Sequence, residues 1–123
     1  MEKLICIIED DEGIQDVLRI ILQRAGYRTR IFSDGRPIME KNYNVPDLFL
    51  IDKQLPDMDG LDICRQLKKD HATSSIPVVI MSAYPNIRQL SKDSAADDFI
   101  EKPFVVQELL TIIEKNISSK AVV

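Results

Sequence analysis

A carboxylate stands at the end of one of the most apolar runs in the chain. Asp52 directly follows the run LFLI at 48–51, which is typical of a strand buried on both faces of a parallel sheet. An acid is costly inside such a core, but the carboxyl ends of strands in an open α/β sheet border the ligand crevice. A second apolar run, 4–8, ends in the same way at Glu9 and Asp10. The two runs predict one shared acidic pocket.

Two further polar side chains are expected at the same edge. Ser82 and Lys102 each follow an apolar run, and the carboxyl ends of parallel strands share one edge of a sheet. Two carboxylates about 4 Å apart repel by roughly 4 kcal/mol at an effective dielectric constant near 20, so the acids need positive charge. Lys102 supplies one charge, and all-oxygen ligands suit Mg²⁺, with Mn²⁺ as an alternative. An acid, a metal, a lysine and a hydroxyl predict chemistry on a phosphoryl group, with a carboxylate as the nucleophile.

Strand and helix signals alternate along the chain. Strands are predicted at 4–8, 27–32, 48–51, 78–81 and 99–100, and helices at 14–26, 37–42, 60–67, 87–94 and 105–117. Val17 and Val106 count among the apolar positions of their helices. Such alternation implies a doubly wound α/β domain, a parallel sheet with helices on both faces. The whole chain, 1–123, is expected to be one domain, with 118–123 as a frayed tail or the start of a linker.

Composition excludes several classes of protein. Of the 123 residues, 45% are hydrophobic and 29% are charged, which fits one domain with one core. The formal net charge of −4 argues against direct nucleic-acid binding. Cys6 and Cys64 lie in apolar patterns and are interpreted as reduced core thiols of a cytoplasmic protein. No apolar run is long enough for a signal peptide or a membrane span, so no membrane contact is expected.

Five ordered motifs resemble the receiver domain of two-component response regulators. They are IIEDDE at 7–12, DLFLID at 47–52, LPDMDG at 55–60, PVVIMSA at 77–83 and ADDFIEKPF at 96–104. The resemblance spans nearly the whole chain. It implies a flavodoxin-like (CheY-like) three-layer sandwich, in which a five-stranded parallel sheet has the order 2-1-3-4-5 and is flanked by five helices.

The resemblance also implies a chemical role for each acid. Asp52 corresponds to the phosphoacceptor, which takes a phosphoryl group from the phosphohistidine of a sensor histidine kinase or phosphotransfer protein. Asp10 and Asp52, with Glu9 through a water and with the backbone carbonyl of Gln54, correspond to the Mg²⁺ site. Lys102 corresponds to the lysine that pairs with the acceptor and then with its phosphoryl group. Such a domain catalyses its own phosphorylation and dephosphorylation and is not a turnover enzyme.

Other matching positions concern switching and output. Ser82 resembles the switch hydroxyl and Phe99 the switch aromatic residue. Gln54 and Tyr84 occupy positions that tune the lifetime of the aspartyl phosphate, and the bond before Pro103 is cis in the family. The expected output surface comprises the helix at 87–94, the strand at 99–100 and the helix at 105–117. It would contact an effector domain or target protein, and a homodimer is an alternative.

Several alternatives stay open at this point. The metal pair is either Glu9-Asp10 or Asp10-Asp11, and the first is preferred because it keeps the following helix in the family's register. Ala95 replaces a glycine of the family, and the segment before it is short, which puts the output mode in question. Three alternative functions belong to other classes. The chain could be an interaction module without phosphorylation, a phosphatase with an aspartyl nucleophile, or a flavodoxin-like cofactor carrier. Gln54 in place of a second acid argues against the phosphatase.

Overall fold

Five parallel strands form a single sheet in the order β2-β1-β3-β4-β5. The computed structural model describes residues 2–90 and 94–121. The strands are β1 (Leu4–Ile8), β2 (Arg28–Phe32), β3 (Leu48–Asp52), β4 (Val78–Ser82) and β5 (Asp98–Glu101). This order confirms the fold expected from the motifs, and its parallel pairing brings the carboxyl ends of all strands to one edge.

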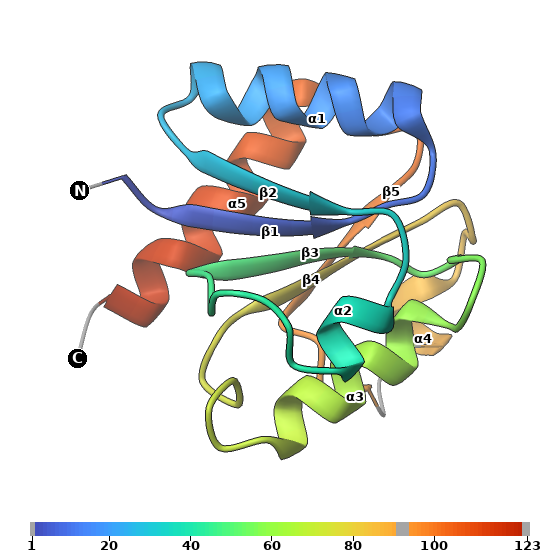
Figure 1. Cartoon of the computed structure of the whole chain (residues 1–123). Helices are drawn as coiled ribbons and strands as arrows, with labels where there is room; N and C mark the ends of the chain where they lie inside the picture. Colours follow the sequence, from blue (N-terminus) through green and yellow to red (C-terminus); the bar gives the residue numbers. More distant parts are fainter. Residues whose placement is uncertain (1, 91–93, 122–123) are drawn as a thin grey trace.

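Helices cover both faces of the sheet. They are α1 (Glu12–Arg24), α2 (Arg36–Met39), α3 (Gly60–Lys69), α4 (Ile87–Leu90) and α5 (Val106–Ala121). Figure 1 shows α1 and α5 on one face, with α2, α3 and α4 on the other. Side chains of a strand alternate between faces, so β3 sends Leu48 and Leu50 to the α1–α5 side and Phe49 and Ile51 to the other. The result is the expected three-layer sandwich.

Local signals explain where the chain becomes helical after β1 and after β3. The side chain of Asp11 caps α1 by accepting from the Ile14 N–H at 2.9 Å, and Asp59 caps α3 by accepting from the Leu61 N–H at 2.9 Å. Carboxylates at these positions satisfy N–H groups that have no partner within the helix. Both caps stand at the edge where the strands end, so they fix the loops around the acids.

The structure corrects several expectations about boundaries and burial. Val17 and Val106 were expected on buried faces, but their side chains are 48% and 49% exposed. On α1 the inward positions are occupied by Gln15, Leu18 and Leu22. The last helix does not end at Ile117 but continues to Ala121, so most of the expected frayed tail is helical, while 122–123 lie outside the described residues. The helix expected at 87–94 is described as far as Leu90, and 91–93 also lie outside.

Two strands that carry site residues, β3 and β4, are each one residue longer than predicted. β3 includes Asp52, which is in register with Met81, and β4 includes Ser82, which is in register with Glu101. The backbones of both polar residues are thereby held by the sheet while their side chains reach its edge. No helix among the described residues combines the length and the apolar content needed to cross a bilayer.

Candidate functional site

Three acids meet at the carboxyl edge of the sheet. Glu9 and Asp10 follow β1, and Asp52 ends the neighbouring strand β3. One carboxylate oxygen from each lies within 4.8 Å of the other two. Glu9 and Asp52 are only 1% and 6% exposed, whereas Asp10 is exposed to solvent. Adjacent strands therefore create a concentration of negative charge that is open on the side of Asp10.

Lys102 places its ammonium group between the two buried acids. Its Nζ donates to Oε1 of Glu9 at 2.7 Å and lies 3.1 Å from Oδ2 of Asp52. The Lys102 N–H donates to the Ser82 carbonyl at 2.8 Å, which fixes the backbone at the start of the β5–α5 loop. The peptide bond between Lys102 and Pro103 is cis. The ammonium group of Lys102, which follows β5, thus links the acid that follows β1 to the acid that ends β3.

Burial and charge act against each other in this cluster. Burial raises the pKa of Glu9 above its usual range, although the hydrogen bond from Lys102 and that from the Asp11 N–H favour the ionised form. Burial disfavours the charge of Lys102, but the hydrogen bond to Glu9 and the charge of Asp52 outweigh it and raise the lysine pKa. The lysine therefore stays charged and compensates part of the negative charge.

The acids in the loop after β1 make different contacts. The Asp11 N–H donates to Oε2 of Glu9 at 3.1 Å, while the Asp11 side chain caps α1. The described acids that could share a metal ion are Glu9, Asp10 and Asp52, which agrees with the preferred register.

Gln15 was not singled out from the sequence, yet its Nε2 donates to the Glu9 carbonyl and to Ser33 Oγ at 3.2 Å. The sequence did contain a signal for this role of Gln15, because it is a polar residue on the inward face of an otherwise apolar helix.

The loop after β3 folds back tightly onto Asp52. A Cβ atom on Gly60 would collide with the main-chain carbonyl of Asp52, and the Gly60 N–H donates to the Lys53 carbonyl at 2.7 Å. Lys53, also not singled out from the sequence, pairs with Asp59 at 2.8 Å and lies 4.8 Å from the ring centroid of Tyr84. The loop is therefore held against the end of β3.

Ser82, Gln54 and Tyr84 form a polar rim beside the acids. Ser82 is 1% exposed, and its Oγ accepts from the Tyr84 N–H at 3.0 Å. The Tyr84 hydroxyl in turn accepts from Nε2 of Gln54 at 2.9 Å. The Gln54 N–H lies 3.4 Å from Oδ1 of Asp52. The two side chains that the resemblance assigned to phosphate lifetime thus contact each other, and the backbone of one of them borders Asp52.

Phe99 lies on β5, half-buried, and is covered by an arginine. The guanidinium of Arg88, in α4, lies 5.3 Å from the ring centroid of Phe99 and 3.5 Å from Oδ1 of Asp98. Asp98 is 6% exposed, and its Oδ2 accepts from Asn116 of α5 at 3.2 Å. Contacts of β5 therefore connect α4 with α5.

The donor set fits a hard divalent cation. Glu9, Asp10 and Asp52 offer carboxylate oxygens, and the described part of the chain brings no thiolate or imidazole to the cluster. Mg²⁺ prefers oxygen donors, keeps several waters, and binds through one or two carboxylates. The exposed position of Asp10 leaves room for those waters.

Comparison with known families agrees with this arrangement of strand-end residues. The family model described as the response regulator receiver domain matches residues 5–114. The chain belongs to this family. This family belongs to two-component signalling, and the acidic pocket of Glu9, Asp10 and Asp52 is typical of the phosphoacceptor site of its members.

Individual relatives show the same fold in several contexts. The receiver domain is 38% identical over 109 residues to the DNA-binding dual master transcriptional regulator RpaA of Synechocystis sp., covering 86% of this chain and 45% of that protein. It thus spans about half the length of the curated relatives it matches. The signal receiver domain of a histidine kinase from Syntrophus aciditrophicus has a TM-score of 0.87 and 32% identity, covering 95% of this chain and 91% of that one.

One solved relative contains the ion that the acidic cluster fits. The receiver domain of the sensor histidine kinase PA1611 from Pseudomonas aeruginosa, described with magnesium coordinated in its active-site cleft, has a TM-score of 0.85 and 25% identity. The alignment covers 96% of this chain and 99% of that one. The acidic triad of this receiver domain is consistent with a site of that kind.

Proposed function

We propose that Asp52 is the phosphoacceptor of this receiver domain. One observation carries the proposal. The Asp52 carboxylate stands at a strand end, 6% exposed, with the Lys102 ammonium 3.1 Å from Oδ2. In the transfer, an Asp52 oxygen attacks the phosphorus of a partner's phosphohistidine, the O–P bond forms, and the P–N bond breaks. The electron pair of that bond returns to the imidazole, which takes a proton.

The residues that would hold Mg²⁺, or Mn²⁺, are Glu9, Asp10 and Asp52, with the backbone carbonyl of Gln54. When bound, the cation neutralises negative charge on phosphoryl oxygens. Asp10 is the exposed member of this set and Glu9 the buried one. Glu9 would therefore have two roles. It would help to bind the cation, and its carboxylate also holds the Lys102 ammonium group and balances its charge.

Lys102 and Ser82 stabilise the product of transfer in this proposal. The acyl phosphate carries more negative charge than the carboxylate it replaces, so the Lys102 ammonium moves from the acids toward the phosphoryl oxygens. The Ser82 Oγ accepts from the Tyr84 N–H, which leaves its own proton available as a donor to a phosphoryl oxygen. Removing either donor weakens the phosphorylated state.

Gln54 and Tyr84 set the lifetime of the phosphoryl group in the same scheme. Their side chains share an exposed hydrogen bond of 2.9 Å, and the Gln54 N–H lies 3.4 Å from Oδ1 of Asp52. Hydrolysis requires a water molecule to reach the phosphorus in line with the Asp52 oxygen, and these side chains restrict that approach. Smaller residues at either position should shorten the lifetime.

The output passes through Phe99 and the surface formed by α4, β5 and α5. A shift of Ser82 toward the phosphoryl group frees space beside β4 that the Phe99 ring can fill, which would end its contact with Arg88. The equilibrium between the conformations of this surface then shifts toward the active one. An effector domain or target protein reads this surface, and a homodimer is the alternative.

A phosphohistidine partner has an apolar groove to contact next to Lys102. The groove has a volume of about 660 Å³ and is lined by Ile14, Val17, Pro103 and Phe104 among others. We propose that a sensor histidine kinase or phosphotransfer protein packs here, in the cytoplasm, with its phosphohistidine toward Asp52.

RpaA is DNA-binding, but the net charge of −4 argues that this domain does not bind DNA itself.

Acetyl phosphate and Mg²⁺ provide the direct test. We expect a shifted band on Phos-tag gels for the native chain and none for Asp52→Asn, because an amide cannot act as the nucleophile. Chelation with EDTA should also abolish the band. Asp57→Asn is the matched control, since that exposed acid lies outside the cluster. A chain that shows neither the band nor binding of fluoroberyllate would be an interaction module without phosphorylation.

A further inference from the structure

β2 forms one edge of the sheet, and its outer side is open. No described strand lies beyond β2 in the sheet order. The Arg28 N–H donates to the Lys3 carbonyl at 2.9 Å, so Arg28 directs its main-chain groups toward β1. Alternate residues of a strand share a side, and Thr29 and Ile31 therefore direct theirs outward. An edge of this kind is a ready template for another strand.

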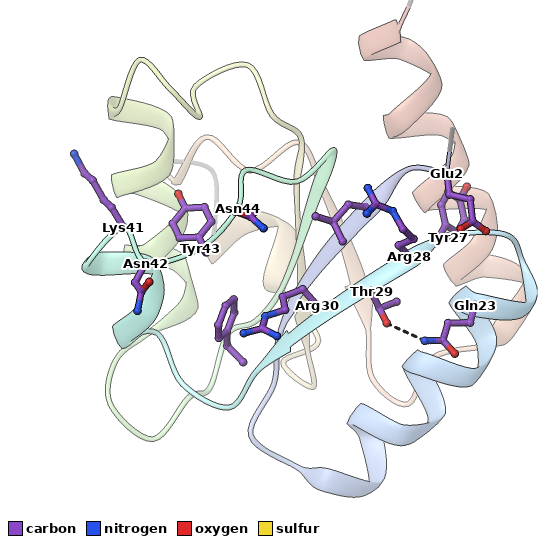
Figure 2. Close-up of a pocket in the computed structure, with 12 residues that line it drawn as sticks. Glu2, Gln23, Tyr27, Arg28, Thr29, Arg30, Lys41, Asn42, Tyr43 and Asn44 are labelled. Atoms are coloured by element: carbon purple, nitrogen blue, oxygen red, sulfur yellow. Dashed lines mark hydrogen bonds between the residues drawn. The ribbon is translucent and has the colours of Figure 1, made fainter.

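A groove of about 900 Å³ runs beside this edge. One wall is β2, and the other is the segment 41–44, which lies between α2 and β3. Figure 2 shows Arg30 projecting from β2 on the side of this segment, while Thr29 lies on the side of α1, where Gln23 donates to its hydroxyl at 3.4 Å. The groove thus exposes one face of β2 along with its edge.

Basic side chains dominate the groove although the chain as a whole is acidic. Arg28, Arg30 and Lys41 line it, against the single carboxylate of Glu2, while the chain carries a formal net charge of −4. Within the described residues, Arg28 and Arg30 form no ion pair. Two guanidinium groups on alternate residues therefore stand beside the open edge without a carboxylate partner.

We propose that this groove binds an extended acidic segment of a partner protein, which adds to β2 as a further strand. The main-chain groups of Thr29 and Ile31 would form the ladder. Side chains on one face of a strand recur every two residues, roughly 6.5–7 Å apart, which is the spacing of Arg28 and Arg30. A segment with Asp or Glu at alternate positions would place a carboxylate opposite each guanidinium.

Charge also argues against a second copy of this chain as the occupant. Pairing of β2 with β2 of another copy would bring Arg28 and Arg30 of both chains together, and like charges on neighbouring strands destabilise a sheet. Charged residues at an edge are a common way to prevent such self-pairing. The same arginines attract an acidic strand, so the edge selects its partner by charge.

A labelled peptide of four Glu-Val repeats tests the proposal by fluorescence anisotropy in 50 mM NaCl. We expect it to bind the native chain and to shift the amide NMR signals of Thr29 and Ile31, while Lys-Val repeats do not bind. Glu-Pro repeats keep the charge but lack half of the strand donors, and should bind about tenfold more weakly or worse. Raising the salt concentration should weaken binding of the Glu-Val peptide.

Matched variants separate the groove from general surface charge. Arg28→Gln with Arg30→Gln should weaken binding of the Glu-Val peptide by about tenfold or more. Arg65→Gln with Lys69→Gln removes the same charge from α3 and should leave binding unchanged. All variants should keep the far-UV circular dichroism and the Mg²⁺-dependent labelling of the native chain.

Three results would overturn the proposal. The first is that the Glu-Val peptide fails to bind. The second is equal binding of Glu-Val and Glu-Pro repeats, which would mean a basic patch without strand addition. The third is a dimer of the chain in sedimentation that the Arg28 and Arg30 substitutions disrupt, which would make a second copy the occupant. None of these results depends on phosphorylation of Asp52.

Discussion

Lys102 and Glu9 form a buried ion pair across 93 residues of sequence, with Nζ 2.7 Å from Oε1. Glu9 is 1% exposed and Lys102 is 16% exposed at its side chain. The pair lies beside Asp52, so the same ammonium group serves both acids. The charge state of the proposed phosphoacceptor pocket therefore depends on a single lysine.

Lys102→Met should separate metal binding from phosphoryl transfer. Without the ammonium group the acids attract Mg²⁺ more strongly, and we expect the Kd measured by calorimetry to fall several-fold. Labelling of Asp52 by acetyl phosphate should fall at least tenfold, because the product loses its counter-charge. Loss of a buried partner should also lower the free energy of unfolding by about 1–3 kcal/mol. The exposed Lys69→Met is the control, and weaker Mg²⁺ binding by Lys102→Met would contradict this account.

Gly60→Ala should disturb the end of β3. The new Cβ atom would meet the Asp52 carbonyl oxygen, a main-chain atom that cannot move aside cheaply. We expect urea denaturation to show a loss of about 2–4 kcal/mol and labelling of Asp52 to slow. Gly13→Ala is the comparison, since its Cβ atom would meet only the Asp11 side chain, at 3.2 Å. In a helix this change should be neutral or stabilising by up to about 1 kcal/mol, and similar losses for the two variants would argue against the clash.

Ala95→Gly should stabilise the domain. Ala95 has a φ of 64°, a left-handed conformation that costs a residue with a side chain about 1–2 kcal/mol. Glycine relieves this cost but loses more entropy on folding, so we expect a net gain of about 0.5–1 kcal/mol in urea denaturation. Ala25→Gly, at a φ of −83°, should instead lose about 0.5–1 kcal/mol. A loss at both positions would show that residue 95 is not strained.

The buried thiols should make stability fall at alkaline pH. Burial raises the pKa of Cys6 to about 12 and that of Cys64 to about 11, from 9.0. The unfolded chain therefore releases thiol protons above pH 9 while the folded chain retains them, and stability is lost as pH rises. Between pH 8 and pH 10 the two thiols together should remove about 2–3 kcal/mol. Cys6→Ala with Cys64→Ala should show a smaller decrease over this range, and parallel curves would contradict the prediction.

Val17→Gln should slow phosphotransfer from a protein partner without affecting the small phosphodonor. Val17 is 48% exposed and lines the apolar groove beside Lys102. With a phosphotransfer domain that labels the native chain, we expect kcat/KM to fall about tenfold. Labelling by acetyl phosphate should stay unchanged. Ile20→Gln alters an equally exposed residue of α1 outside the groove, and an equal effect of both substitutions would place the partner elsewhere on α1.

The sequence by itself determined the class of fold and the polar residues gathered at the carboxyl edge of its sheet. Apolar runs ending at Glu9, Asp52, Ser82 and Lys102 predicted strands with polar ends, and parallel pairing requires such ends to meet. Five ordered motifs then supplied the strand order. These inferences succeeded because they depend on local pattern and on spacing along the chain. Boundaries were less accurate, since the pairing that extends β3 to Asp52 comes from Met81 of the neighbouring strand.

Only the tertiary structure decided which side chains face each other. The contact of Lys102 with Glu9, the hydrogen bond of Gln54 to Tyr84 and the inward position of Gln15 join residues from different elements. No local pattern encodes these distances, because they follow from how strands and helices pack. The exposure of Val17 has the same origin, since Gln15 and Leu18 occupy the inward face of α1. The basic groove beside β2 likewise exists only because the segment 41–44 returns alongside an edge strand.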